Sequence, residues 1–166
     1  MSGEEVKKKG PVYSGETKYI SQEGGYAVWL PNEWRKIDMV GGHSGWIFTP
    51  YPDRIDTCFA CEKITLDFQV SPDDLKVLVE GFEAGINHLP DAVIEEKKYD
   101  TGKMAILLEA KFTFTENGQR RKRWVKSLYW HEANLVLLGQ GATLEEYEYW
   151  LPMLFNTMNS YEIGIA

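Results

Sequence analysis

The fold follows from the stretch KMAILLEAKFTFTENGQRRKRWVKSLYWHE, residues 103–132. Two runs rich in aromatic, aliphatic and β-branched residues meet at Asn117–Gly118, and both of these residues tolerate the positive φ angles of a type I′ turn. The stretch therefore predicts a long antiparallel hairpin with a two-residue loop. In that register the opposed residues are Phe114 with Arg121, Phe112 with Arg123, Lys111 with Trp124, and Glu109 with Lys126.

The segments on both sides of the hairpin extend it into a meander. AVIEEKKYD (92–100) precedes it and NLVLLGQG (134–141) follows it, each separated from it by a short run of turn residues. Consecutive strands joined by such short turns are antiparallel. Aromatic and β-branched residues predict three earlier strands: YAVWLP (26–31), GWIFTP (45–50) and TCFACEKITLDFQV (57–70).

Two segments have helical spacing instead. SPDDLKVLVEGFEAGINHLP (71–90) is the first, and TLEEYEYWLPMLFNTM (143–158) is the second, which opens with Thr143 and Glu146 in a capping-box arrangement. Pro152 is expected to kink or split the second helix. The predicted apolar faces are Leu75, Leu78, Val79, Phe82 and Ile86 in the first helix, and Leu144, Tyr147, Leu151, Leu154 and Met158 in the second.

This order of elements predicts an α+β protein, an antiparallel sheet flanked by helices. A length of 166 residues is that of one domain. Residues 1–19 are polar, charged and glycine-rich, and we interpret them as a flexible N-terminal tail. Residues 20–166 are interpreted as a single domain, because they contain no linker-like stretch and no internal repeat.

Charge and hydropathy restrict the partners and the compartment. Aspartate and glutamate outnumber lysine and arginine by 25 to 18, a net charge of −7 that disfavours nucleic acid as a partner. No run of about 18 apolar residues predicts a membrane span. With Met1 as the native start the sequence predicts a cytoplasmic protein, whereas a removed leader would allow export.

The segment GYAVWLPNEWRK (25–36) resembles the opening of the PsbP-like superfamily, in which an aromatic strand runs into a proline, a short turn and a tryptophan. Tyr26, Pro31 and Trp34 carry the resemblance, and the order of elements is similar over residues 24–160. The family fold is an antiparallel sheet between helices, an α/β/α sandwich. Its members include photosystem II extrinsic subunits, a Ran-binding import factor and uncharacterised bacterial proteins. The resemblance implies an accessory or binding protein and transfers no catalytic residue.

The only two cysteines, Cys58 and Cys61, have the C-x-x-C spacing of redox dithiols and of half a zinc site. The surrounding sequence is that of a strand, in which residues three apart point to opposite faces of the sheet. Two separate buried thiols are therefore predicted. We predict no metal site, no cofactor and no catalytic residue, since the three histidines lie in separate segments without ligand spacing.

Two surface segments are candidate binding sites. RRKRWVK (120–126) places four consecutive cations beside a tryptophan in an acidic protein, which makes it a candidate for docking a protein or an anionic partner; the residues are Arg120, Arg121, Lys122, Arg123 and Trp124. The structural alternative is that the arginine stems cover phenylalanines with their heads in water, Lys111 stacks on Trp124, and Glu109 pairs with Lys126. The second candidate is a glycine-rich loop: Gly41, Gly42, His43 and Ser44.

Two functions remain open at this level. The first is a non-enzymatic binding module that recognises an unidentified protein or anionic partner through the hairpin or the loop. The alternative is a helix-grip domain, in which a curved sheet and the C-terminal helix enclose a small apolar ligand; its cavity would be lined by Trp29, Phe59, Leu108 and Trp130. The sequence favours the first because Pro152 interrupts the closing helix and because a long helix is predicted in the middle of the chain. An enzyme comes third, since no motif in the sequence is specific to one.

Overall fold

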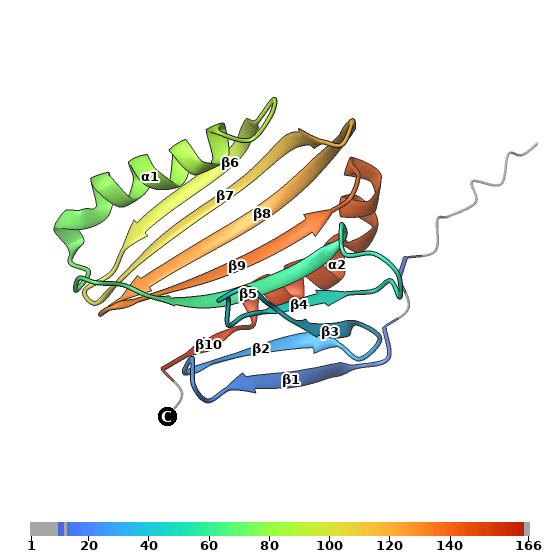
Figure 1. Ribbon diagram of the computed structural model, residues 1–166, viewed down its shortest axis with the longest axis horizontal. Coiled ribbons are helices and arrows are strands. Elements are labelled where there is room, and N and C mark those ends of the chain that lie inside the picture. The colour runs from blue at the N-terminus through green and yellow to red at the C-terminus, as the bar shows by residue number, and fades with distance from the viewer. Residues whose placement is uncertain (1–9, 12, 165–166) are drawn as a thin grey trace, which may run out of the picture.

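In a computed structural model, which describes residues 10–11 and 13–164, the chain forms a seven-stranded antiparallel sheet and a smaller three-stranded one (Figure 1). The large sheet has the order β3 (Arg35–Asp38), β4 (Trp46–Thr49), β5 (Cys58–Thr65), β9 (Ala133–Gly141), β8 (Gln119–Trp130), β7 (Ala105–Glu116), β6 (Val93–Thr101). The small sheet has the order β1 (Glu16–Ser21), β2 (Tyr26–Pro31), β10 (Glu162–Ile163). The predicted antiparallel class is confirmed.

The hairpin β7–β8 has the predicted register. Asn117 and Gly118 form its loop with φ angles of 51° and 76°. All four predicted pairs are present, from Phe114 opposite Arg121 to Glu109 opposite Lys126. The type I′ turn therefore sets which side chains of twelve-residue strands face each side of the sheet.

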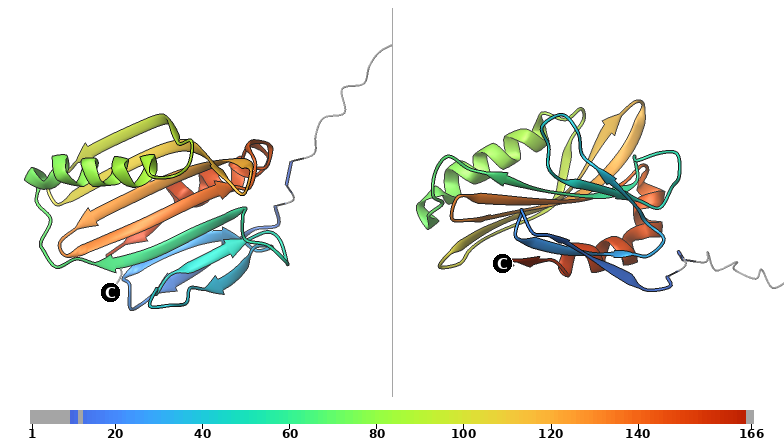
Figure 2. Two further views of the ribbon diagram at one scale, coloured as in Figure 1. Left: turned by 45° about the horizontal axis from the view of Figure 1, so that its top comes forward. Right: turned by 60° about the horizontal axis from the view of Figure 1, so that its bottom comes forward.

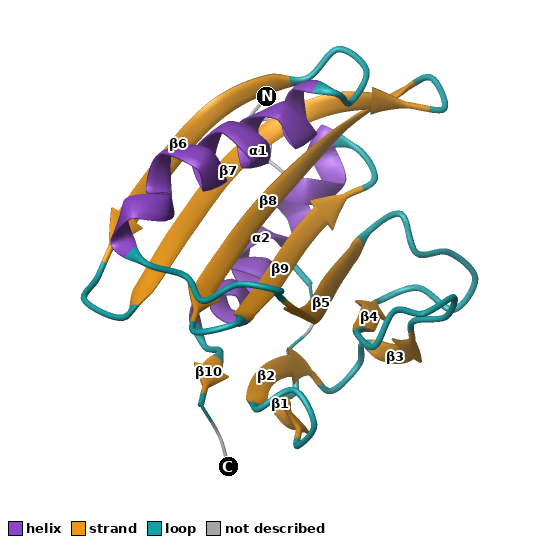
Figure 3. Ribbon diagram, turned by 60° about the vertical axis from the view of Figure 1, so that its left-hand side comes forward, coloured by secondary structure: helices purple, strands orange, loops and turns teal. Residues whose placement is uncertain are grey.

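Two helices lie on opposite faces of the large sheet. α1 (Leu75–Asn87), preceded by a 3₁₀ turn at Pro72–Asp74, packs on β6 and β7 at one end of the sheet (Figures 1 and 3). α2 (Leu144–Asn159) packs on β8 and β9 on the other face, and β2 of the small sheet lies beside it (Figure 2). The result is the sandwich of helices and sheet that the sequence predicted.

Each face has its own apolar cluster. The larger one fills the space between α2 and the two sheets; its fully buried side chains include Phe48, Phe59, Leu135, Leu137 and Leu154. The smaller one lies under α1 and consists of Ile86, Ala110, Phe112 and Phe114 with half-buried neighbours. Burial of apolar side chains is the main source of folding free energy, so α2 contributes the larger share.

Several boundaries differ from the prediction. Residues 16–19, assigned to the tail, belong to β1, where Tyr19 packs 4.8 Å from Phe48 between ring centroids; exposed polar neighbours had hidden this strand. The rest of the predicted tail includes residues 1–9 and 12, which lie outside the described residues. β5 ends at Thr65 and not at residue 70, and the short edge strand β3 was not predicted.

The second helix is not split at Pro152. α2 continues through it to Asn159 because Pro152 and Glu148 are both exposed, so water can solvate the carbonyl that loses its backbone partner. Leu144, predicted on the apolar face, is 44% exposed in the first turn. Within the described residues, no helix has both the length and the apolar composition needed to cross a membrane.

Candidate functional site

Half of one sheet face has no helix over it. α1 packs on β6 and β7, and the same face continues across β8, β9 and β5 without a covering helix among the described residues (Figures 1 and 3). The strand registers arrange its central side chains in rows: Val125, Leu138, Ala60 and Ile47, then Ser127, Val136 and Glu62, then Tyr129, Asn134 and Ile64. We call these ten residues the open face.

The centre of the open face is apolar and only half-buried. Val125, Leu138 and Val136 are apolar side chains of intermediate exposure in the middle strands of the sheet. Asn134 belongs to the same face, and its buried Oδ1 has no hydrogen-bond partner in the part of the chain that the structure describes. The signal for this surface was present in NLVLLGQG, because a continuous apolar run predicts a strand with apolar side chains on both faces.

The basic stretch 120–124 is divided between the two faces of the sheet. Arg121 and Arg123 lie opposite Phe114 and Phe112, on the side of α1, at one end of the open face. Trp124 points to the other side, where it is 2% exposed and belongs to the cluster under α2. Side chains alternate along a strand, so cations that are consecutive in sequence cannot form one positive spot. The prediction of a single exposed patch is corrected accordingly.

Each of the four cations also has a partner within the protein. Arg120 donates to the carbonyl oxygen of Asp91 and to the hydroxyl of Thr113, each at 2.6 Å. The other three contacts are Arg121 with Glu116 at 3.2 Å, Lys122 with Glu95 at 3.2 Å, and Arg123 with Gln140 Oε1 at 2.8 and 2.6 Å. Arg121 is only 7% exposed, and burial lowers the pKa of Arg123. The expectation that the arginine heads reach water was wrong for Arg121.

The predicted stacking on the α2 side is confirmed in part. Lys111 Nζ lies 4.6 Å from the ring centroid of Trp124, as expected for a cation–π contact. Lys126 lies opposite Glu109, but its ammonium group donates to Asn159 Oδ1 at 2.8 Å, while Glu109 accepts from Trp124 Nε1 at 2.8 Å. Glu109 and Lys126 therefore do not form the predicted cross-strand ion pair, because Glu109 binds Trp124 and Lys126 binds Asn159 at the end of α2.

The glycine-rich loop borders the open face at another side. Gly41 and Gly42 have φ angles of 70° and 85°, which side chains rarely adopt. His43 Nδ1 lies 3.1 Å from each carboxylate oxygen of Glu62, and the backbone N–H of Ser44 donates to Glu62 Oε2 at 3.0 Å. Glu62 belongs to the open face, so the loop is attached to its edge.

The tertiary structure therefore places two residues of the basic stretch, Arg121 and Arg123, and the glycine-rich loop around one surface. The row that borders the open face at one end consists of Arg123, Gln140 and Cys58. Glu62 lies four residues further along β5 from Cys58. Strand geometry separates Arg123 from Glu62 by about 10 Å across the strands and about 13 Å along them. The apolar rows of the open face lie between the two.

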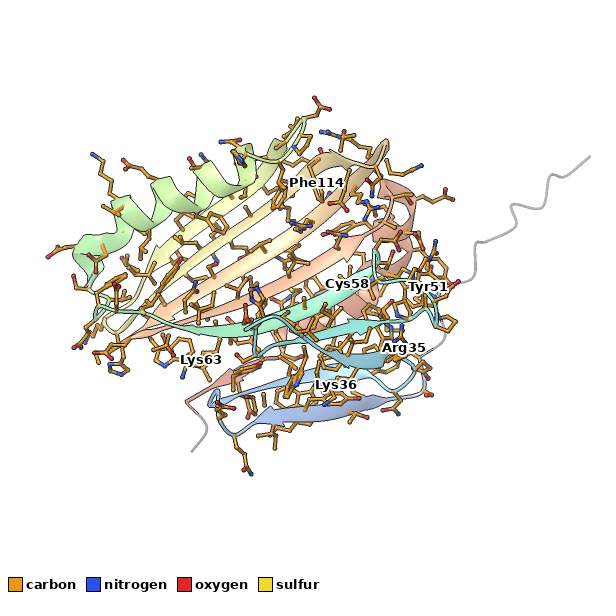
Figure 4. The ribbon with its side chains drawn as sticks, in the orientation of Figure 1. Arg35, Lys36, Tyr51, Cys58, Lys63 and Phe114 are labelled. Atoms are coloured by element: carbon orange, nitrogen blue, oxygen red, sulfur yellow. The ribbon has the colours of Figure 1, made fainter. Side chains whose placement is uncertain are left out.

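The cysteines lie as predicted, on opposite faces of β5. Cys58, at the start of β5 (Figure 4), points to the side of the open face beside Gln140. Cys61 points to the α2 side, where its Sγ lies 3.7 Å from the Tyr26 hydroxyl. Both are free thiols, 7% and 1% exposed, and burial raises the pKa of each to about 12. Within the described residues, no group of three histidine, cysteine, aspartate or glutamate side chains could hold a metal ion.

The residues predicted to line a ligand cavity do not meet. Phe59 is fully buried in the cluster between the sheet and α2. Leu108 is also fully buried, but it alternates in step with Ala110 and Phe112, which face α1. The sheet therefore separates the two side chains, and they cannot enclose the same small molecule.

The comparisons with known proteins show the fold. Family models give no match to this chain, and curated protein sequences give none either. Among solved structures, the cyanobacterial PsbP of Synechocystis sp. PCC 6803 superposes with a TM-score of 0.64 at 10% identity, covering 93% of this chain and 96% of that one.

Two further structures are similar over nearly the whole chain. LpqN of Mycobacterium tuberculosis, described as involved in cell envelope biogenesis, has a TM-score of 0.59 at 16% identity and covers 90% of each chain. The Ran-binding protein Mog1p of Saccharomyces cerevisiae has a TM-score of 0.58 at 7% identity, covering 91% of this chain and 96% of that one. This chain therefore has the PsbP-like fold that the segment 25–36 indicated.

Proposed function

We propose that this chain is a non-enzymatic binding module that docks a protein partner on its open face. The observation that carries the proposal is the uncovered half of the sheet, with Leu138 and Val136 half-buried at its centre and Val125 at the edge of the cluster under α1. An apolar centre with a polar border is the anatomy of protein–protein interfaces. Contiguous apolar surface on a folded protein marks an interaction site more often than isolated exposed residues do.

The border of the open face supports the same proposal. Arg121 Nε and Asn134 Oδ1 are buried side-chain atoms without a hydrogen-bond partner among the described residues. Arg123 at one end, and His43 with Ser44 at the edge, supply further polar groups. In this proposal Arg121 and Arg123 at one end and the glycine-rich loop at the edge form the rim of one interface, and the apolar side chains between them supply the contact area.

The class of partner follows from charge and from the fold. Because Glu116 and Glu95 neutralise Arg121 and Lys122 and the net charge is −7, the hairpin offers a nucleic acid only the charges of Arg120 and Arg123, which disfavours nucleic acid as the partner. One protein of the same fold, Mog1p, is a Ran-binding protein. That similarity supports protein binding as the activity and does not identify the partner.

A comparison of two variants tests the proposal. The tagged full-length chain, its Leu138→Glu variant and a Val93→Glu control would each be used to capture proteins from an extract of the source organism, with quantification by mass spectrometry. Val93 is 54% exposed on the edge strand β6, away from the open face. We expect a specific partner to be depleted at least tenfold by Leu138→Glu and retained by Val93→Glu.

Two results would contradict the proposal. Partners captured equally by both variants would place the interface elsewhere, provided that thermal denaturation shows Leu138→Glu to be folded. Native mass spectrometry showing a small organic molecule retained by the purified chain would favour the ligand-binding alternative instead.

A further inference from the structure

The helix beside the open face contains two glycines that its own packing does not explain. Gly81 and Gly85 lie inside α1, and neither has a positive φ angle. A Cβ atom added at either position would meet no described atom within 4 Å. Glycine inside a helix lowers the folding equilibrium constant about fivefold relative to alanine. The described chain therefore bears a cost at two exposed positions without using the space that the missing side chains leave.

Two glycines of β9 show how such space is used on the covered face. A Cβ atom at Gly139 would lie 3.2 Å from Leu154 Cδ2, and one at Gly141 would clash with the backbone of Tyr147. Leu154 and Tyr147 belong to α2, so these glycines let a helix approach the sheet closely. The glycines of α1 offer the same close approach to an element that is not among the described residues.

Gly81 and Gly85 lie on the flank of α1 that adjoins the open face. Ile86 packs on the sheet, and Lys97 of the edge strand β6 donates to Glu83 at 2.9 Å. Each glycine is two residues from Glu83, so each lies about 160° away from it around the helix axis. The glycines therefore face away from β6, on the side of α1 where β8 and β9 continue the sheet (Figure 3).

The dimensions of the open face match one helix beside α1. Neighbouring strands lie about 4.8 Å apart, so β8, β9 and β5 span about 10 Å, the diameter of a helix with its side chains. From the row of Arg123 to the row of Tyr129 the chain advances six residues, about 20 Å, which is the length of about 14 helical residues. α1, with 13 residues, covers β6 and β7 in the same way.

One end of this surface has a positive charge without an acidic partner. Arg123 donates to Gln140 Oε1 at 2.8 and 2.6 Å, and its guanidinium carbon lies 4.5 Å from the centroid of the Phe114 ring. Both partners are neutral, and no carboxylate of the described residues forms an ion pair with Arg123. A carboxylate brought by a partner would complete this site, because charge-assisted hydrogen bonds to arginine are strong.

We propose that the partner docked on the open face contributes an amphipathic α-helix of about four turns, lying beside α1 with an acidic residue at Arg123. This inference rests on the proposed docking function and adds the structure and charge of the docking element. A helix satisfies its own backbone hydrogen bonds, whereas an extended segment needs a free sheet edge, which the middle of a sheet does not provide. The glycine flank allows the short interaxial distance of close helix packing.

A phage-displayed library of random sixteen-residue peptides is the probe, because it presents helical and extended sequences alike. Peptides are selected on the immobilised full-length chain, with an excess of the Leu138→Glu variant in solution to remove those that bind elsewhere. We expect the enriched sequences to have apolar residues at i, i+3, i+4 and i+7 and an acidic residue near one end. Synthetic copies are then titrated against the variants below by fluorescence anisotropy.

Gly81→Leu/Gly85→Leu separates binding from folding. Leucine favours a helix and meets empty space in the free chain, so the melting temperature should rise by about 4 °C. The same side chains occupy the space of the docked helix, so the affinity for the enriched peptides should fall at least tenfold. Glu80→Leu/Asn87→Leu adds leucines at exposed positions on the opposite flank of α1 and should leave the affinity unchanged.

Arg123→Gln tests the charge of the occupant. It should weaken binding about fivefold and reduce the dependence of affinity on salt, because it removes the cation that the acidic residue contacts. Lys98→Gln removes the same charge from an exposed position of β6 and should change neither.

Four results would overturn the inference. They are enriched peptides with alternating apolar residues, no peptides that distinguish the native chain from Leu138→Glu, undiminished binding by Gly81→Leu/Gly85→Leu, and a dimer of the native chain that Leu138→Glu dissociates. The first would identify an extended occupant and the last a second copy of this chain. Protein capture with Leu138→Glu and Val93→Glu tests docking on the open face separately, so a failure of the helix can be told apart from a failure of the docking function.

Discussion

The two faces of the seven-stranded sheet are built from the same strands and yet end in different environments. On one face α2 and the small sheet cover the strands, and Phe59, Leu137 and Leu154 are fully buried. On the other face α1 covers only β6 and β7, and Val125, Val136 and Leu138 stay half-buried. The strands are more polar on the second face, where Ser127, Asn134 and Glu62 lie among the valines and leucines, and no helix covers β8, β9 and β5 there among the described residues. The open half of the second face is therefore surface available for binding.

The largest effect should separate a covered leucine from an uncovered one. Leu154→Ala is expected to lower the free energy of unfolding by about 3 to 4 kcal/mol, since Leu154 is fully buried and truncation leaves a cavity. Leu138→Ala should cost only about 1 kcal/mol, because the side chain keeps contact with water. Urea denaturation of both variants measures the difference. Equal losses would mean that the open face is as tightly packed as the core.

Arg121→Glu tests whether the basic stretch is structural. The Arg121 guanidinium group is 7% exposed and is paired with Glu116, so a carboxylate at this position would lie beside another one with little water. We expect a loss of about 3 kcal/mol in the free energy of unfolding. Lys98→Glu, on the exposed edge strand β6, is the matched charge reversal and should change stability by about 0.5 kcal/mol or less. An Arg121→Glu protein as stable as the native one would restore the exposed-patch interpretation.

Cys58 and Cys61 lie on opposite faces of the sheet, so the pH dependence of the free energy of unfolding tests the burial of each face. The pKa of each thiol is raised to about 12 in the folded protein, so thiolates form first in the unfolded chain, near its ordinary value of 9. Stability should therefore be unaffected by the thiols below pH 9 and should decrease between pH 9 and 12. By pH 10 the loss is about 1.4 kcal/mol for each thiol.

Denaturation at pH 8 and pH 10 measures this effect in the native chain and in single Cys58→Ala and Cys61→Ala variants. Each variant should show about 1.4 kcal/mol less pH dependence than the native chain. A Cys58→Ala variant with an unchanged pH dependence would show that the side of the open face is already hydrated at this position.

The smallest effect is expected at the border of the open face. His43 is 63% exposed, and its contact with Glu62 is one of the solvent-accessible ion pairs, which contribute little to stability. His43→Ala should lower the free energy of unfolding by about 0.5 kcal/mol or less. Thermal denaturation measures it, and a loss above 2 kcal/mol would show that the loop is a structural clasp for β5 and not part of a binding rim.

Local sequence determined most of the secondary structure. The Asn117–Gly118 turn correctly predicted the register of a hairpin with two twelve-residue strands, because a two-residue loop fixes the pairing of all residues on both sides of it. Strand alternation also predicted that Cys58 and Cys61 point to opposite faces. The prediction from local sequence was wrong at β1, because its exposed polar residues resemble those of a flexible tail and only the pairing with β2 identifies them as a strand.

The candidate site depended on tertiary structure. The same alternation that separated the cysteines also divides Arg121 and Arg123 from Lys122 and Trp124. The partners of Lys122 and Arg123 are Glu95 of β6 and Gln140 of β9, which lie outside the hairpin and which no local pattern identifies. The open face exists only because α1 is placed over β6 and β7, leaving β8, β9 and β5 uncovered. Sequence by itself thus determined which residues form strands and helices, since turn geometry and periodicity are local. Which apolar residues remain in contact with water was decided by the packing of elements far apart in the chain.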